Sequence, residues 1–272
     1  MEIKSNISQE IANTLFDDER LEKLPDLRSL LSGYYSNSDE AHMLNHIDLV
    51  KGRAIDMMIF LYQRFNIKTN AIIVLIAIEL HDVGSCIDRE HHDMASLKLI
   101  RDTDEIKDFL VNNMKITTDE FMKLTYAILQ HGSHFDGDDY YSVESEVVAS
   151  ADRDNIDIYE ILYRSTKYSQ KYNPDNVVEA TSKYNISRYA SPYDSKDYRV
   201  PSWHFDYYIQ KYGNDIWNSL MKFFNNEKAV YRTVEMINDN CSEYDVRNYI
   251  KETISPVKNT YNEAVEVKRL FR

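Results

Sequence analysis

A histidine and an aspartate, His81 and Asp82, directly follow an apolar run in this sequence. The run extends from Ala71 to Leu80 and contains one charged residue, Glu79. Imidazole and carboxylate groups both bind divalent cations, so a buried segment that ends in this pair delivers two metal-ligating groups to one place. We therefore interpret His81-Asp82 as part of a metal site.

Other metal-ligating side chains occur on both sides of this pair. The candidates are His46, His91 or His92, His131 and Asp152. A divalent cation held by such groups lowers the pKa of its bound water, which then acts as a hydroxide-like nucleophile near neutral pH. A single histidine of this kind could be an ordinary core residue, so the metal-site interpretation rests on the whole set.

Helices are the elements that must position these residues. Glycine and proline are scarce, at 6 and 5 residues, and apolar residues recur at intervals of three and four. No segment keeps the strict alternation that marks a half-buried strand, so the sequence predicts an all-α protein. Thr117 and Glu120 fit a capping box, which would open one of the helices.

Three predicted helices place a candidate ligand on or beside an apolar face. The segment 40–65 carries His46, and the segment 143–163 carries Asp152. The helix that begins at the capping box carries His131 near its end. Together with the apolar run before the His-Asp pair, four helices would each bring a ligand candidate inward.

Length and composition suggest one large helical domain with added segments. The chain has 272 residues, of which 43% are hydrophobic, and this is enough to form a substantial core. We expect an N-terminal helical extension over 1–39 and a metal-binding core over 40–165. Over 166–272 we expect a loop-rich insertion followed by helices that resume at Trp203 and pack on the core.

Charge and cysteine content exclude several classes of protein. A formal net charge of −13 argues against a nucleic-acid surface, which needs clustered lysine and arginine. Two cysteines, Cys86 and Cys241, leave no disulfide framework. No signal peptide is recognisable, and the apolar run is shorter than the about 20 residues that span a bilayer. We expect a cytoplasmic protein without a membrane partner, and its tyrosine-rich C-terminal region could form a homodimer surface.

Five segments resemble successive motifs of the HD-domain metal-dependent phosphohydrolase superfamily. They are NHIDLVKGRA, IELHDVGS, REHHDMASLKLI, ILQHGSHFDG and VVASADRDNID. The resemblance covers roughly residues 40–160 and implies a helical HD-domain core. It also implies that His46, His81, Asp82 and Asp152 are core metal ligands.

The resemblance further implies a binuclear site. Binuclear members of the superfamily have two more histidines between the His-Asp pair and the last aspartate, which here would be His92 and His131. In those members the aspartate of the pair bridges the metals, a role that falls to Asp82. The small residue Ser96, four positions after His92, favours this histidine, and His91 is the alternative.

The segment HGSHFDGDDYY also resembles, more loosely, the HD-GYP branch of cyclic-di-GMP phosphodiesterases. The sequence departs from that branch because Gly132 replaces its second histidine and Ser85 replaces its lysine. Two further histidines lie near ligand candidates in the sequence. His134 could contact the substrate or lie in an exposed loop, and His42 could reach the metals or lie on the surface.

A phosphohydrolase also needs cationic side chains to hold phosphoryl oxygens. The candidates for substrate binding are Lys51, Arg53 and Arg153. Arg53 follows His46 by seven residues and therefore lies nearly on the same helix face, whereas Lys51 points away. Arg153 could instead form a surface salt bridge. Arg53 is the preferred catalytic cation.

The sequence thus predicts a phosphomonoesterase or phosphodiesterase that acts on a nucleotide or small phosphorylated metabolite through a metal-bridging hydroxide. Catalysis is assigned to Asp82 and Arg53. The site is expected to hold two divalent metal ions, with Fe or Mn favoured over Mg, Co, Ni or Zn. The alternatives are a di-iron HD-fold oxygenase and a catalytically inactive nucleotide-binding regulatory module.

Overall fold

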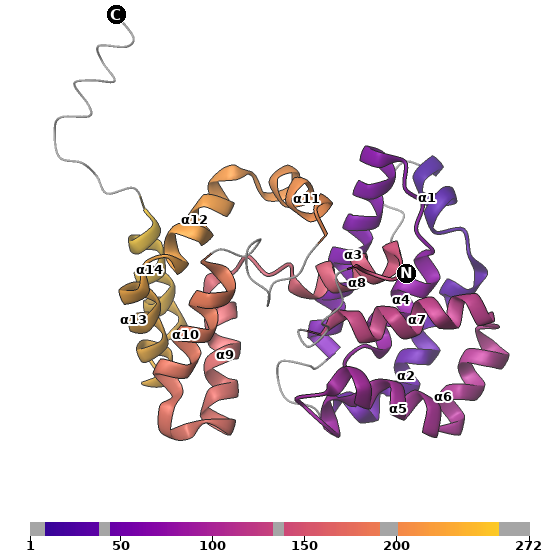
Figure 1. Ribbon diagram of the computed structural model, residues 1–272, viewed down its shortest axis with the longest axis horizontal. Coiled ribbons are helices and arrows are strands. Elements are labelled where there is room, and N and C mark those ends of the chain that lie inside the picture. The colour runs from indigo at the N-terminus through magenta and orange to yellow at the C-terminus, as the bar shows by residue number, and fades with distance from the viewer. Residues whose placement is uncertain (1–8, 38–43, 133–138, 191–200, 256–272) are drawn as a thin grey trace, which may run out of the picture. The chain divides into compact units, whose positions relative to one another are not determined.

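The protein folds into α-helices, which confirms the predicted all-α class. A computed structural model describes the chain, and the described residues contain no strand (Figure 1). None of the described helices is long and apolar enough to cross a membrane. The described residues are 9–37, 44–132, 139–190 and 201–255.

The chain divides into two compact units. The first consists of Met1–Asn155 and Lys196–Lys211, and the second of Ile156–Ser195 and Tyr212–Arg272. The boundary therefore lies after Asn155 rather than near residue 165. A later stretch of the chain returns to the first unit, which sequence analysis did not anticipate.

The first unit contains the helices that carry the candidate ligands. Its α-helices are α1 (Gln9–Leu15), α2 (Leu24–Tyr35), α3 (Leu44–Phe65), α4 (Ala71–Leu80), α5 (His92–Asp102), α6 (Asp104–Asp108), α7 (Thr118–His131), α8 (Val143–Arg153) and α11 (Trp203–Tyr212). Short helical segments are η2 (Glu19–Lys23), η4 (Val83–Cys86) and η5 (Phe109–Asn113).

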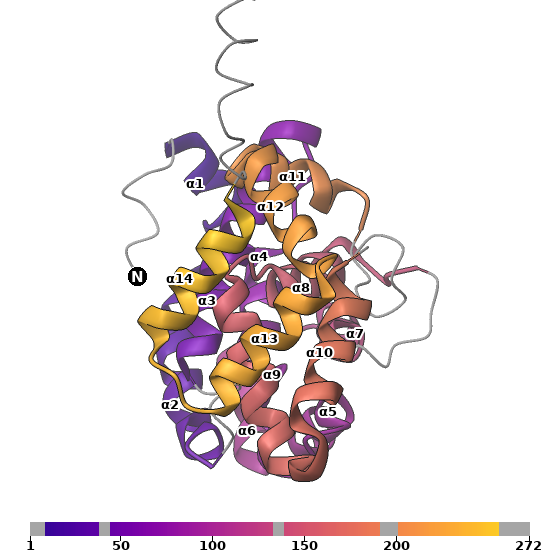
Figure 2. The same cartoon turned by 90° about the vertical axis from the view of Figure 1, so that its left-hand side faces the viewer.

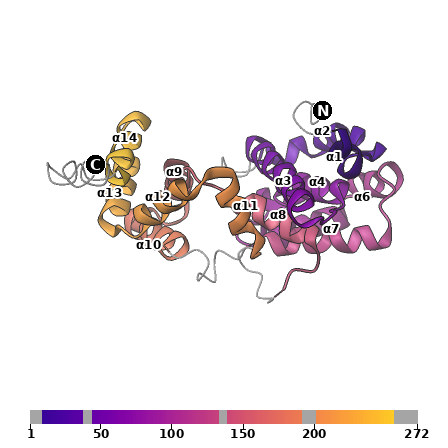
Figure 3. The same ribbon diagram turned by 90° about the horizontal axis from the view of Figure 1, so that it is seen from above.

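Helix α4 forms the centre of this unit. All ten of its residues are buried, because a helix that is apolar on every side must be covered on every side. Helices α2, α3, α7 and α8 all contact it, and Figure 3 shows α3, α4, α7 and α8 grouped together. The apolar run therefore brings the His-Asp pair at its end into the interior.

One charged residue of α4, Glu79, is buried with its charge compensated. Its carboxylate accepts hydrogen bonds from Arg28 Nε and Nη2 at 2.9 and 3.0 Å, and from Lys51 Nζ at 3.0 Å. The Tyr35 hydroxyl donates to the Glu79 carbonyl at 2.7 Å, and Arg28 also contacts Asp48. This network fixes α2 and α3 against α4.

Helix α7 begins with the predicted capping box. Glu120 N–H donates to Thr117 Oγ1 at 3.3 Å, and the Glu120 carboxylate accepts from Thr117 N–H at 3.0 Å. The same carboxylate accepts from Arg20 at 2.8 and 3.1 Å and from Asn70 Nδ2 at 3.2 Å. The start of α7 is thereby tied to two other parts of the first unit.

Helix α11 is the element that returns to the first unit. It begins at Trp203, as predicted, and Trp203 Nε1 donates to Glu146 Oε2 on α8 at 2.6 Å. Lys211 forms an ion pair with Asp56 on α3 at 2.7 Å. His204 is fully buried between these contacts, and burial lowers its pKa to about 3. A neutral imidazole therefore lies in the core here.

The prediction of a single helix over 143–163 is wrong, because α8 ends at Arg153. Asp157 accepts hydrogen bonds from the N–H groups of Tyr159 and Glu160 and so caps a new helix, α9 (Ile158–Tyr172). Capping of this kind satisfies N–H groups that have no partner within a helix and so favours a new start. Asp152 therefore lies in the last turn of α8 and not in the middle of a long helix.

The second unit consists of helices α9 (Ile158–Tyr172), α10 (Val177–Tyr189), α12 (Asn214–Phe224), α13 (Glu227–Asn238) and α14 (Glu243–Ile254), with the short η6 (Pro174–Asn176). Helix α13 contacts α9, α10, α12 and α14, and the elements can be followed in Figure 2. Its core includes Trp217, Leu220, Phe223 and Phe224 from α12.

The prediction of a loop-rich insertion is wrong for residues 177–189, which form helix α10. Its buried face is largely polar, so hydrophobic periodicity did not reveal it. Asn185 Nδ2 donates to the Thr181 carbonyl at 2.8 Å, and Thr181 Oγ1 donates to Ser169 Oγ on α9 at 2.8 Å. The rest of the predicted insertion, 191–200, lies outside the described residues.

We predict that Glu120→Gln destabilises the protein in a pH-dependent way. The Arg20 hydrogen bonds lower the Glu120 pKa to about 2 from its usual 4.5. The ionised carboxylate therefore stabilises the fold above about pH 4.5, and this contribution disappears as the pH falls towards 2. At pH 7 the loss should be about 1–2 kcal/mol, allowing for partial solvent screening.

Urea unfolding of both proteins between pH 7 and pH 3 measures this difference. The exposed Glu105 on α6 provides a control, since Glu105→Gln should change the free energy of unfolding little at any pH. A difference between wild type and Glu120→Gln that does not shrink below pH 4.5 would contradict the assignment.

Candidate metal centre

The candidate ligands lie at the ends of helices that meet in the first unit. His81 is the C-cap residue of α4, His131 is the last residue of α7, and Asp152 lies in the last turn of α8. Helix C-termini carry partial negative charge, so three of them directed at one place favour a cation there. His46 comes from the first turn of α3, and His92 is the first residue of α5.

Three candidate histidines are held in the same way. In each ring, Nδ1 lies within hydrogen-bond distance of the backbone carbonyl three residues earlier. The pairs are His81 with Ile78 at 2.8 Å, His92 with Arg89 at 3.1 Å, and His131 with Ile128. A carbonyl oxygen only accepts, so Nδ1 must be the protonated nitrogen, and the neutral ring then has its lone pair on Nε2. That is the form of histidine that binds a metal.

Asp82 lies among the Nε2 atoms of four histidines. Its Oδ2 is 3.5 Å from His46 Nε2 and 3.3 Å from His81 Nε2. Its Oδ1 is 3.3 Å from His92 Nε2 and 3.5 Å from His131 Nε2. Each carboxylate oxygen thus faces a different pair of imidazoles.

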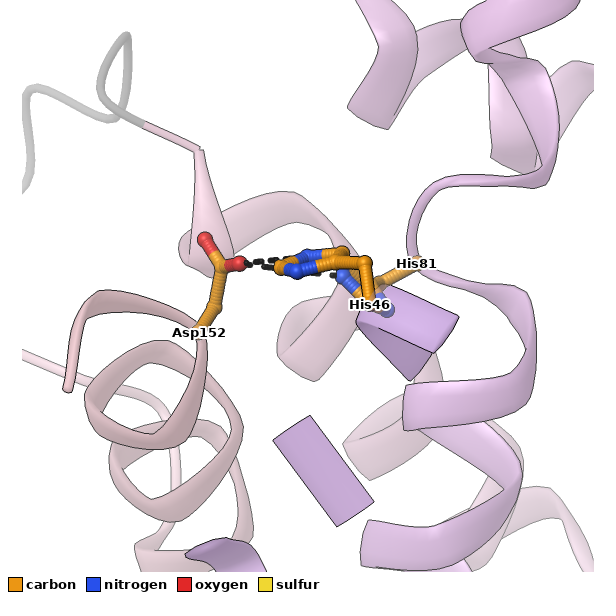
Figure 4. A group of neighbouring side chains, drawn as sticks. All are labelled: His46, His81 and Asp152. Atoms are coloured by element: carbon orange, nitrogen blue, oxygen red, sulfur yellow. Dashed lines mark ion pairs between the residues drawn. The ribbon is translucent and has the colours of Figure 1, made fainter. Parts of the chain in front are cut away.

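Two groups of ligand atoms follow from this arrangement. The first cluster contains His46, His81 and Asp152, with Asp82 Oδ2 3.5 and 3.3 Å from the two histidines, and His46 Nε2 lies 3.0 Å from Asp152 Oδ1. Figure 4 shows Asp152 directed at His46, with His81 beside it. The second cluster contains His92, His131 and Asp82 Oδ1, and His81 lies within reach of Asp82 and His131. His81 also packs against His131, with ring centroids 4.8 Å apart.

The spacing of these atoms fits divalent cations. Donor atoms about 2.1 Å from one cation, at angles of about 90–110°, lie about 3.0–3.5 Å apart. The Nε2 atoms of His92 and His131 are 3.0 Å apart, and with both Nδ1 atoms protonated their lone pairs would oppose each other. Among the described residues, the buried Nε2 of His81 also has no hydrogen-bond partner and faces the Asp82 carboxylate at 3.3 Å. A shared cation would resolve both features.

The protonation of the first cluster reflects its two carboxylates. Burial lowers the pKa of His81, but the negative charges of Asp82 and Asp152 outweigh burial and raise that pKa to about 9. Burial would raise the pKa of Asp152, but its hydrogen bond and charge interaction with His46 hold the pKa well below its usual value. The two carboxylates, buried Asp82 and partly exposed Asp152, therefore attract positive charge, which either protons or metal ions can supply.

The structure distinguishes the two adjacent histidines. His92 lies in the second cluster, with 15% of its side chain exposed. His91 points away from the cluster, with 59% of its side chain exposed and Nδ1 3.5 Å from Asp88 Oδ2. His92 is therefore the ligand candidate of the pair.

The lysine and arginine side chains that we predicted to bind substrate have different surroundings. Arg53 is half-buried and donates from Nη1 to the Ala151 carbonyl at 3.4 Å, directly before Asp152. Lys51 is bound to Glu79 instead. Its predicted role in substrate binding is not supported, because its ammonium group compensates a buried carboxylate.

The alternative in which Arg153 forms a surface salt bridge is wrong, because only 4% of the residue is exposed. Its Nη2 donates to the Gly132 carbonyl at 3.0 Å, and its Nη1 lies 3.3 Å from the Ala149 carbonyl. The side chain therefore links the end of α8, near Asp152, to the residue after His131. This position holds the ends of α7 and α8 together.

One buried carboxylate near the second cluster was not anticipated from the sequence. Asp93 follows His92 and is buried, and a Cβ atom added to Gly132 would lie 3.3 Å from Asp93 Oδ2. Only its position next to a ligand candidate could have drawn attention to it. His42 and His134, also considered as site residues, lie outside the described residues.

We predict that single histidine substitutions lower the metal content of the protein to different extents, depending on the cluster that they affect. Wild-type protein purified without chelator should contain about two metal ions per chain, as expected for a binuclear centre. His92→Ala should remove about one equivalent, because the second cluster keeps only two ligands. His81→Ala should reduce the content further, because it removes a fully buried ligand of the first cluster.

Elemental analysis of the purified variants measures these contents. His91→Ala is the matched control, because it removes the neighbouring exposed imidazole and should leave the metal content unchanged. A His92→Ala variant that retains the full wild-type content would exclude His92 as a ligand.

Comparison with known proteins gives no match to this chain among family models, curated proteins or solved structures. The likeness to the HD-domain superfamily therefore rests on the five sequence motifs. An activity has to be argued from the chemistry that the two clusters support.

Proposed function

We propose that this protein is a metal-dependent phosphohydrolase that acts on a nucleotide or small phosphorylated metabolite. The observation that carries the proposal is the position of Asp82, whose two carboxylate oxygens each face a pair of histidine Nε2 atoms at 3.3–3.5 Å. A carboxylate placed in this way can bridge two cations. Paired cations are a recurrent device for hydrolysing phosphate esters and anhydrides.

Two divalent cations at such a site would lower the pKa of a bound water and offset negative charge on the phosphoryl oxygens. The protein's own contribution is to fix the ligands. The Nδ1 hydrogen bonds to backbone carbonyls orient His81, His92 and His131, and bonds of this kind support metal binding. Burial of Asp82 and His81 keeps bulk water from this part of the site.

Exposure of the ligand side chains indicates where a phosphate would approach. Asp152 in the first cluster retains 24% exposure and His92 in the second retains 15%, whereas His81, Asp82 and His131 are at most 3% exposed. A substrate would therefore meet both clusters from the side of Asp152 and His92.

Arg53 is the cation suited to contact this substrate. Its guanidinium group lies next to the residue that precedes Asp152 and remains partly exposed. Arginine can bind two phosphoryl oxygens at once, so it can both orient the phosphate and stabilise charge that develops on it. Arg153 is instead occupied with backbone carbonyls.

We predict that Asp82→Asn and Arg53→Ala impair hydrolysis to different degrees. Asp82→Asn should lower kcat about a hundredfold or more, because a neutral amide bridges two cations poorly. Arg53→Ala should lower kcat/KM by about tenfold to a hundredfold, less than the about 10²–10³ for a fully buried donor to a developing oxyanion.

The assay would use manganese-loaded protein with p-nitrophenyl phosphate and bis-p-nitrophenyl phosphate, followed by a panel of nucleotides. Arg101→Ala is a matched control, because Arg101 is exposed on α5 and paired with Asp102. Turnover that survives Asp82→Asn would contradict the proposed role of this residue.

Two experimental outcomes would support a function other than phosphate hydrolysis. Oxygen consumption by the iron-loaded protein, without phosphate release, would indicate the di-iron oxygenase. Tight nucleotide binding without turnover under any metal would indicate the regulatory module.

A further inference from the structure

The turn that carries Asp82 lies unusually close to helix α5. A Cβ atom added to Gly84 would lie 2.2 Å from Ser96 N and 2.7 Å from the His92 carbonyl oxygen. Real Cβ atoms do not approach backbone atoms this closely, so only glycine fits. The backbone after Asp82 therefore contacts the first turn of α5, the turn that begins with His92.

One buried hydroxyl group joins these two backbone segments. Ser96 Oγ accepts a hydrogen bond from Gly84 N–H at 2.8 Å and donates one to the His81 carbonyl at 2.8 Å. Ser96 is fully buried, so water does not compete for these bonds. The hydroxyl group thus contacts the backbone on both sides of Asp82.

We propose that Ser96 is a positioning residue that holds His92 in register with Asp82 and so completes the second cluster. The inference rests on the proposed function, because it assumes that the two clusters bind cations. It goes further in assigning to Ser96 the hydrogen bonds that fix the first turn of α5 against the turn after α4.

The two clusters depend on this connection to different extents. The first cluster takes His46, His81 and Asp152 from α3, from the end of α4 and from α8, and these helices contact one another directly. The second cluster takes His92 from α5, which packs against η4 and α7, and the two hydrogen bonds of Ser96 tie the first turn of α5 to the backbone on both sides of Asp82. Neither bond reaches α3 or α8, so loss of the hydroxyl group should weaken the second cluster more than the first.

A purely structural role for Ser96 predicts a different effect of its substitution on metal affinity. If the hydroxyl group only stabilised the fold, its removal would lower the unfolding temperature without a preference for either cation. A positioning role requires the affinity for one cation to fall while the affinity for the other is retained. The ratio of the two affinities therefore distinguishes the roles.

The experiment is a titration of metal-free full-length protein with Mn²⁺, followed by equilibrium dialysis and electron paramagnetic resonance. In wild type we expect two Mn²⁺ ions, the second producing a spin-coupled signal. In Ser96→Ala the second Mn²⁺ should bind about 10–100-fold more weakly, as for other residues that orient metal ligands. The first should bind within about twofold of wild type, a change of less than 0.5 kcal/mol.

Two further variants make the test specific. Ser96→Cys keeps the branching of the side chain but replaces the hydroxyl group with a larger, weakly hydrogen-bonding thiol, so it should also lose affinity for the second Mn²⁺. Ser150→Ala is the matched control, because Ser150 is fully buried on α8 and its hydroxyl group makes no hydrogen bond with the described residues. It should bind both ions as wild type does.

The outcomes separate this proposal from the proposed function. If wild type, Ser96→Ala and Ser96→Cys all bind two ions with the same affinities, Ser96 has no positioning role, although the metal centre stands. Equal weakening of both ions in the Ser96 variants would also overturn the proposal. Failure of the wild type to bind Mn²⁺ at all would overturn the metal centre itself.

Discussion

The burial of the Asp82 carboxylate is the constraint on which the candidate site depends. A buried carboxylate costs several kcal/mol in lost hydration unless positive charge or hydrogen bonds compensate it. The apolar helix α4 forces this burial, because all ten of its residues lie in the core and Asp82 lies two positions after its last residue, Leu80. Four histidines from four parts of the first unit provide the compensation.

Two buried carboxylates at this end of α4 are compensated in different ways. Glu79 is bound by Arg28 and Lys51, whose charges are permanent and which have no lone pair to offer a metal. Asp82 is surrounded by imidazoles, which become metal ligands when they lose a proton. The first arrangement fixes helices together, whereas the second can exchange protons for metal ions.

The ends of the helices add to this difference. The last carbonyl groups of a helix lack partners within it, and in α4 and α7 a ligand imidazole satisfies one of them through Nδ1. The same hydrogen bond leaves the lone pair on Nε2, directed at the shared carboxylate. Local helix termination and ligand orientation therefore have a common cause.

Much of the fold and the residues of the His/Asp groups that could bind a metal could be predicted from the sequence, because both depend on short-range patterns. Residue spacing indicated the helices that bear His46 and His131, the apolar run marked α4, and Thr117 with Glu120 gave the start of α7. The pattern failed at α10, where polar residues fill the buried face. It also failed between α8 and α9, where α8 ends at Arg153 and a single capping aspartate, Asp157, begins the next helix.

Tertiary structure alone decided how the side chains near the site are used. The contacts of Lys51 with Glu79, of Arg153 with Gly132 and of Ser96 with Gly84 join residues between 12 and 28 positions apart. Such contacts depend on how helices pack, and no local periodicity specifies them. The sequence by itself therefore determined which residues could bind a metal. The packing decided that His92 and not His91 faces Asp82, and that Arg53, unlike Lys51, is not paired with Glu79.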